Sequence, residues 1–162
     1  MTEQEAIKLA RSYFITEDNV YGCAETTLMV LQQAFDLPGA ADSSPAMALN
    51  GGIAWSGGPC GALTGAALAV GRLAGQRVAD HKEAKRAARA LIARLMAGFR
   101  AEFGHTDCRA LVGLDISTVE GHTNFVDSQL WHTVCMDQIV FVLRKLVALA
   151  DEEMWQEPLP ER

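Results

Sequence analysis

Four cysteines are the residues of this 162-residue chain best suited to chemistry: Cys23, Cys60, Cys108 and Cys135. The sequence around the first three is typical of the opening turn of a helix. Unpaired backbone N–H groups and the positive end of the helix dipole favour a thiolate there. Since the thiolate is the form that attacks disulfides and binds metals, the pattern indicates redox chemistry or metal binding.

The segment around Cys60 is the most informative of the four, because it reads Gly-Gly-Pro-Cys-Gly over residues 57–61. Pro59 suits the first position of a helix and Gly58 suits its cap, which predicts that Cys60 lies inside the first turn. Cys60 is therefore the best candidate for an activated thiol, and Gly58 and Gly61 are the expected cofactor-binding glycines beside it. The alternative is a small buried residue on a tightly packed helix.

The other candidate residues have weaker local support. No two cysteines have the spacing of a CxxC pair or a zinc finger, so any common site has to be assembled by the fold. Cys135 is expected in the middle of an apolar helix and joins the site only if the fold brings it there. His105, His122 and His132 are candidate ligands or proton carriers, although a lone histidine is more often only hydrogen-bonded.

Charge and composition exclude several classes of protein. A net charge of −6 and a pI near 5.1 argue against nucleic-acid binding, and the basic run over residues 82–100 is expected to be a solvated helix face. No apolar stretch is long enough to span a bilayer, since Arg72 interrupts the longest candidate. The motifs of P-loops, serine hydrolases, metalloproteases and EF-hands are absent.

The start of the chain bears on its compartment. It is acidic and lacks the basic and apolar regions of a secretory signal, so a cytoplasmic protein with reduced thiols is expected.

Apolar residues recur at helical spacing almost throughout, which predicts an all-α fold. We expect one helical domain of about five to seven helices over residues 1–155, followed by a short tail at 156–162. The predicted helical segments are 2–15, one that starts at 22 or 23 and ends at 35, 46–50, 59–74, 80–103, 108–112 and 130–150, with a helical fragment inside the polar stretch 113–129. The segment 130–150 is apolar nearly all round, so it should be buried, either at the centre of a monomer or at a homodimer interface.

The cysteines and their surroundings resemble a known family. The matching pieces are Gly22-Cys23-Ala24, the run Cys-Gly-Ala-Leu-Thr-Gly-Ala at 60–66, Phe103-Gly104 with Cys108-Arg109, and Cys135. With these, the chain resembles the redox-active proteins named for their C_GCAxxG_C_C cysteine pattern. The resemblance implies an all-helical fold and a redox or metal-linked role for the four cysteines.

The leading hypothesis is a redox-active protein in which Cys23, Cys60, Cys108 and Cys135 converge. They would bind an iron–sulfur cluster or another thiophilic metal centre, for which thiolates are suitable ligands, or undergo thiol–disulfide exchange with Cys60 as the attacking sulfur. The partner would be an unknown redox protein or small molecule, and neither nucleic acid nor membrane is expected. The alternative is a non-catalytic binding or assembly module with structural cysteines. Whether the protein is an enzyme stays open.

Overall fold

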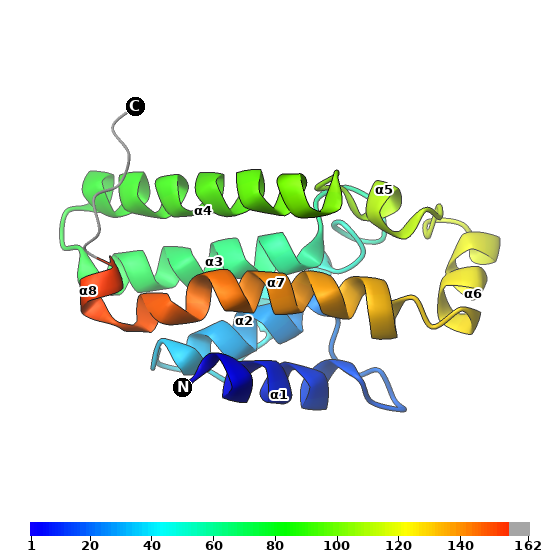
Figure 1. Ribbon diagram of the computed structural model, residues 1–162, viewed down its shortest axis with the longest axis horizontal. Helices are drawn as coiled ribbons and strands as arrows, with labels where there is room; N and C mark the ends of the chain where they lie inside the picture. The colour runs from blue at the N-terminus through cyan, green and yellow to red at the C-terminus, as the bar shows by residue number, and fades with distance from the viewer. Residues whose placement is uncertain (156–162) are drawn as a thin grey trace.

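The computed structural model describes residues 1–155, so the predicted tail at 156–162 lies outside the described residues. Over residues 1–155 the chain forms eight α-helices and no strand, which confirms the all-α prediction with slightly more helices than expected (Figure 1). The helices are α1 Glu3–Phe14, α2 Cys23–Ala34, α3 Gly61–Arg77, α4 His81–Phe103, α5 Cys108–Val112, α6 Val119–Asp127, α7 Met136–Leu146 and α8 Glu152–Trp155.

Local signals explain why several helices begin and end where they do. Thr2 caps α1 and forms a capping box with Glu5, as its sequence predicts. Asp80 accepts hydrogen bonds from the backbone N–H groups of Lys82 and Glu83 at the start of α4, and Gly104 ends that helix in a left-handed conformation. The predicted piece at 46–50 is a 3-10 helix, η1 Ser44–Leu49.

Helices α3 and α7 lie in the middle of the bundle, with α4 along one side and α1 and α2 on the other (Figure 1). The predicted segment 130–150 consists of a π-helical turn η2 Trp131–Cys135, then α7, then a 3-10 turn η3 Val147–Ala150. Ile139, Val142 and Leu143 of α7 are fully buried, which confirms the expected central helix. The short helix α8 follows η3.

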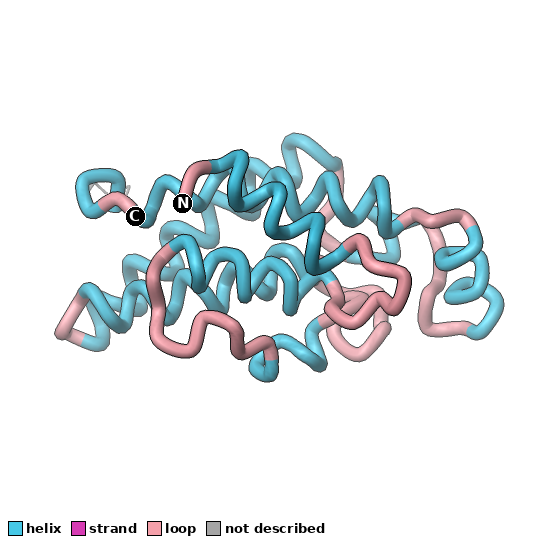
Figure 2. The backbone as a smooth tube through the Cα atoms, turned by 90° about the horizontal axis from the view of Figure 1, so that it is seen from below, coloured by secondary structure: helices cyan, strands magenta, loops and turns pink. Residues whose placement is uncertain are grey.

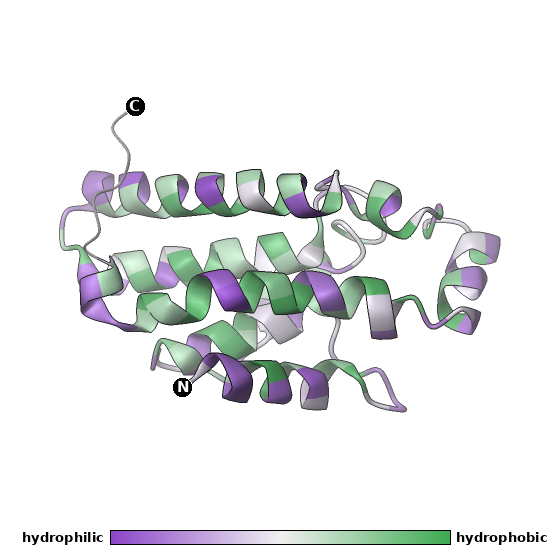
Figure 3. Ribbon diagram, in the orientation of Figure 1, coloured by the Kyte–Doolittle hydropathy of each residue, from purple (hydrophilic) through white to green (hydrophobic). Residues whose placement is uncertain are grey.

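The amphipathic prediction for α4 also holds. Leu91, Leu95 and Phe99 are buried, whereas the basic side chains of this helix are exposed, and Figure 3 shows hydrophilic bands along its outer side. The basic run is therefore a solvated face, as expected. None of the helices in the described part of the chain is long and apolar enough to cross a bilayer.

The backbone between η1 and Cys60 is the least regular part of the fold. Figure 2 shows several irregular segments gathered near the end of the bundle away from α8. Within this region Gly51, Gly52, Ile53, Ala54 and Trp55 all have positive φ, between 50° and 74°, so five consecutive residues form a left-handed turn. This conformation costs a non-glycine residue about 1–2 kcal/mol, and it is rarest for β-branched residues such as Ile53.

Replacing Ile53 by glycine is expected to stabilise the protein by up to about 1 kcal/mol. Glycine adopts φ > 0 without the steric penalty, and Ile53 is 45% exposed, so little apolar burial is lost. Val20 is the matched control, because it is a β-branched, exposed loop residue that is not in the left-handed region. Val20→Gly should lower the free energy of unfolding slightly through unfolded-state entropy. Urea denaturation checks both; equal losses for the two variants would show that Ile53 is unstrained.

Candidate functional site

Three of the four cysteines lie at helix N-termini, as predicted. Cys23 is the first residue of α2 and Cys108 the first of α5. Cys60 differs from its prediction by a small shift, because it is the N-cap of α3 rather than a residue inside the first turn. The reason is that Pro59 pairs with Asp107 in an isolated antiparallel bridge, so the backbone is still extended at the proline.

That bridge fixes Cys60 and Cys108 next to each other. The Cys60 N–H donates to the Thr106 carbonyl at 2.8 Å, and the Cys108 N–H donates to the Gly58 carbonyl at 2.7 Å. Two segments that lie almost fifty residues apart in the chain are thereby joined through their backbones.

Cys135 arrives from the opposite side of the site. It is the last residue of the π-helical turn η2, where its N–H donates to the Leu130 carbonyl five residues earlier at 3.3 Å, and it is also the N-cap of α7. The sequence indicated a regular helix here. Single π-turns within helices occur frequently at functional sites.

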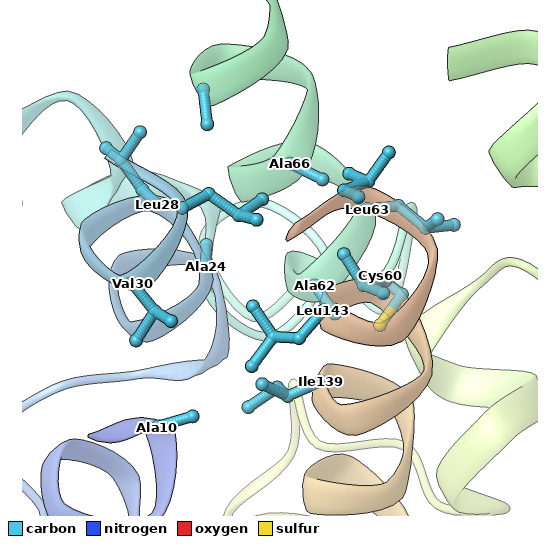
Figure 4. Close-up of a cluster of buried hydrophobic side chains, with 14 of the residues drawn as sticks. Ala10, Ala24, Leu28, Val30, Cys60, Ala62, Leu63, Ala66, Ile139 and Leu143 are labelled. Carbon is cyan, nitrogen blue, oxygen red and sulfur yellow. The ribbon is translucent and has the colours of Figure 1, made fainter. Parts of the chain in front are cut away.

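The four thiols converge. Cys23, Cys108 and Cys135 line one cavity of about 230 Å³. Cys60 lies behind this wall, 3% exposed, and its thiol donates to Gln138 Oε1 of α7 at 3.3 Å. Figure 4 shows Cys60 packed beside α7. The effect of the thiols on one another's ionisation also indicates that the sulfurs are close together. The four thiols form six pairs, and in each pair the charge of one thiolate raises the pKa of the other thiol.

Burial is the main cause that raises the pKa of all four thiols, and the pKa of Cys108 rises to about 12. Helix starts alone predicted thiols that ionise easily, so this part of the expectation is wrong for the metal-free protein. No other thiol raises the pKa of Cys23, and backbone N–H groups of Gly51, Ala24 and Gly61 partly oppose the effect of burial on it. Cys23 is also the least buried of the four.

Sequence reasoning missed the polar support of Cys23. Asn50 Oδ1 accepts the Ala24 N–H at 2.9 Å and faces the Cys23 sulfur at 4.0 Å. Asn50 Nδ2 donates to the buried carboxylate of Glu25 at 2.8 Å, and that carboxylate also accepts from Ser43 and the Gly22 N–H. The only sequence signal was the polar Asn50 directly before Gly51-Gly52.

Replacing Asn50 by alanine is expected to lower the free energy of unfolding by about 1–3 kcal/mol, because it removes partners of Ala24 and Glu25 in a largely buried network. Asn124→Ala is the matched control, since Asn124 is an exposed side chain on α6. Thermal unfolding of the reduced protein measures both changes. A loss no larger for Asn50 than for Asn124 would contradict a supporting role.

The glycines expected to bind a cofactor have packing roles in the structure. A Cβ on Gly61 would lie 2.2 Å from the Cys23 sulfur, so glycine is what lets α3 approach that thiol. Gly58 supplies the carbonyl that accepts the Cys108 N–H, and its own N–H donates to Gly52. Neither glycine lines the cavity.

None of the three candidate histidines lines the thiol cavity either. The ring of His122 packs edge-on against Trp55, with centroids 4.7 Å apart, and His132 packs in the same way against Trp131. His105 is exposed. Within residues 1–155, no group of three or more His, Cys, Asp or Glu is arranged to hold a single metal ion.

Comparison with known proteins identifies a family. The model of a family described as "Putative redox-active protein (C_GCAxxG_C_C)" matches residues 21–149, which contain all four cysteines. No curated protein and no solved structure matches the chain.

Proposed function

This chain belongs to the C_GCAxxG_C_C family of redox-active proteins, and on that premise we propose that Cys23, Cys60, Cys108 and Cys135 together bind a redox-active thiophilic metal centre, of which an iron–sulfur cluster is the best fit. The observation that supports this most is the convergence of four thiols from four separate segments, three of them on one cavity wall. A dithiol exchange would need only two.

The electrostatics favour a metal over thiol–disulfide exchange. An attacking sulfur has to be a thiolate, but burial raises the pKa of all four thiols, and no cationic side chain contributes an opposing shift. Four neighbouring thiols, three of them buried, need a compensating positive charge to ionise together. A metal centre supplies that charge.

The donor set also bears on which metal would bind. Four thiolates suit iron–sulfur clusters, zinc and Cu(I). Because no three ligands in the described part of the chain are arranged around one ion, the site does not fit a preformed mononuclear zinc site. A cluster of several metal atoms tolerates more widely separated sulfurs, and when bound it would supply one-electron transfer.

The protein's own groups would orient and tune the sulfurs. Backbone N–H groups of Gly51 and Ala24 favour the charged form of Cys23, and those of Ala62 and Leu63 favour that of Cys60. Hydrogen bonds to ligand sulfurs are one way in which proteins set the reduction potential of a cluster. The proposed location is the cytoplasm, where thiols stay reduced.

Elemental and sulfide analysis of protein purified without oxygen, together with its visible spectrum, tests the proposal. We expect stoichiometric iron and sulfide, directly or after anaerobic reconstitution. Changing any one of the four cysteines to serine should lower bound iron at least tenfold. Thr133→Ala is the control, because Thr133 is exposed on the same π-helical turn as Cys135.

Two results would contradict a metal centre. A folded protein that stays metal-free after reconstitution, and in which one Cys→Ser change traps a mixed disulfide, would indicate thiol–disulfide exchange. A metal-free protein in which Cys60→Ser and Cys108→Ser are neutral and native thiols label slowly would indicate a binding module with structural cysteines.

A further inference from the structure

The thiol cavity has walls that the proposed metal centre does not use. Beyond the three sulfurs its walls are mostly apolar, with the four aromatic rings of Phe14, Trp55, Phe125 and Trp131, and its polar side chains are Asn19, Glu25 and Asn50. We propose that the outer part of this cavity binds an uncharged, largely apolar small molecule with an aromatic ring, held against Trp55. This proposal rests on the cavity walls and goes beyond the proposed metal centre.

The size of the cavity limits the ligand. Pockets for drug-sized ligands and cofactors usually measure about 300–1,000 Å³, whereas a closed apolar cavity of about 150 Å³ is enough to hold benzene. At about 230 Å³ the thiol cavity lies between these values. A molecule with one or two rings therefore fits, and a nucleotide or dinucleotide does not.

The charge of the walls disfavours an anionic ligand. No lysine, arginine or histidine lines the cavity, so a phosphate, sulfonate or carboxylate would lose its hydration without a cationic partner. The one charged residue among the lining side chains is Glu25. Both of its oxygens already accept hydrogen bonds, from Ser43 on one and from Gly22 and Asn50 on the other, so it offers a ligand little beyond repulsion of anions.

The left-handed turn explains how an indole comes to stand at the mouth of the cavity. Trp55 ends the run of five positive-φ residues, it is 40% exposed, and its ring contacts the edge of His122. Strained backbone of this kind persists where surrounding structure holds it, and it concentrates at ligand sites. Val20 and Met47, which are 63% and 61% exposed, line the same mouth together with the exposed Asn19.

The ligand and the proposed metal centre would share one cavity. Cys60 lies outside the cavity and interacts with the three cavity-lining thiols, so a centre bound to all four sulfurs would occupy the space beside those three thiols. The whole cavity measures about 230 Å³, so a bound centre leaves too little room for a ligand with two rings. The ligand is therefore expected to bind the metal-free protein and to be excluded from the metal-loaded one.

Calorimetric titration of the full chain with 1-naphthol and with naphthalene-1-sulfonate tests the inference. These probes share a ring system and differ in charge at neutral pH. We expect 1-naphthol to bind at least tenfold more tightly, with a negative heat-capacity change. Trp55→Ala should weaken 1-naphthol binding at least tenfold and Trp55→Phe less than threefold, since an aromatic ring is kept. Trp155→Ala is the control. Trp155 lies on α8, where it packs against Arg77 of α3, and it does not line the cavity.

Three outcomes would overturn the inference. They are equal binding of the two probes by the metal-free protein, unchanged binding by a folded Trp55→Ala variant, and equal binding before and after the metal is loaded, which would place the ligand outside the cavity. Metal content is measured on the same samples. A chain that binds 1-naphthol but no metal would refute only the proposed function, and a chain that binds metal but does not bind 1-naphthol in its metal-free form would refute only this inference.

Discussion

Replacing Gly65 by alanine is expected to destabilise the protein by about 3 kcal/mol or more. An added Cβ would lie 2.3 Å from the backbone oxygen of Ala24 and 3.1 Å from its carbonyl carbon. The obstacle is the backbone of α2 rather than the end of a flexible side chain, so α2 and α3 would have to move apart. Overpacking of a core commonly costs about 1–3 kcal/mol, and a rigid neighbour places this site at or above the top of that range.

Helix α3 contains its own control. Gly71 lies on the same helix, is exposed, and has nothing within 4 Å of the position of an added Cβ. Gly71→Ala should stabilise the protein by up to about 1 kcal/mol, because alanine is the better helix former. Denaturant unfolding gives both values.

The same substitution should also affect the thiol site. Cys23 begins α2 and Cys60 caps α3, so separating these helices moves the two sulfurs apart, and Gly65→Ala is expected to lower bound metal as well as stability. Similar free energies of unfolding for Gly65→Ala and Gly71→Ala would show that the close approach of α2 and α3 is unimportant.

Most of the helical architecture was predictable because its signals are local. Capping residues such as Thr2 and Asp80 and the left-handed Gly104 set helix ends, and apolar spacing indicates the buried faces of α4 and α7, without reference to the rest of the chain. The π-helical turn ending at Cys135 was not predictable, because its sequence also suits a regular helix. The left-handed turn was not predictable either, since Ile53 disfavours it and only the surrounding structure holds it.

The candidate site was predictable in its residues more than in its properties. The cysteine pattern indicated which thiols would gather, but local sequence could not show that Cys60 would be buried behind the other three or that Gln138 would accept its hydrogen bond. It also gave the wrong direction for thiol ionisation. The helix-start effect acts locally, whereas burial and the neighbouring thiols depend on tertiary packing, and burial is the larger effect here.

Raising the pH of the metal-free, reduced protein from 8 to 10 is expected to lower its free energy of unfolding by about 5 kcal/mol. A solvated cysteine thiol has an ordinary pKa of 9.0, and burial raises the folded-state pKa of all four thiols above it. Between these values the unfolded chain has lost protons that the folded chain retains. The contribution of the thiols to the free energy of unfolding is therefore fully present below about pH 9. It is lost as pH rises toward the folded-state pKa values, by about 1.4 kcal/mol per thiol per pH unit.

Unfolding by urea at a series of pH values, with a chelator and a reductant present, measures this loss. A domain of this size is typically stable by about 5–15 kcal/mol, so the effect should bring the protein close to unfolding near pH 10. Cys135→Ala should reduce the slope by about a quarter, because it removes one of the four thiols that lose their protons in the unfolded chain. A variant with all four cysteines changed to alanine keeps Tyr13, Tyr21 and every lysine, so it controls for other groups that titrate in this range. If that variant lost as much stability as the parent protein, the buried thiols would not be the cause. A bound metal centre should remove the alkaline loss, because it holds the sulfurs ionised at neutral pH.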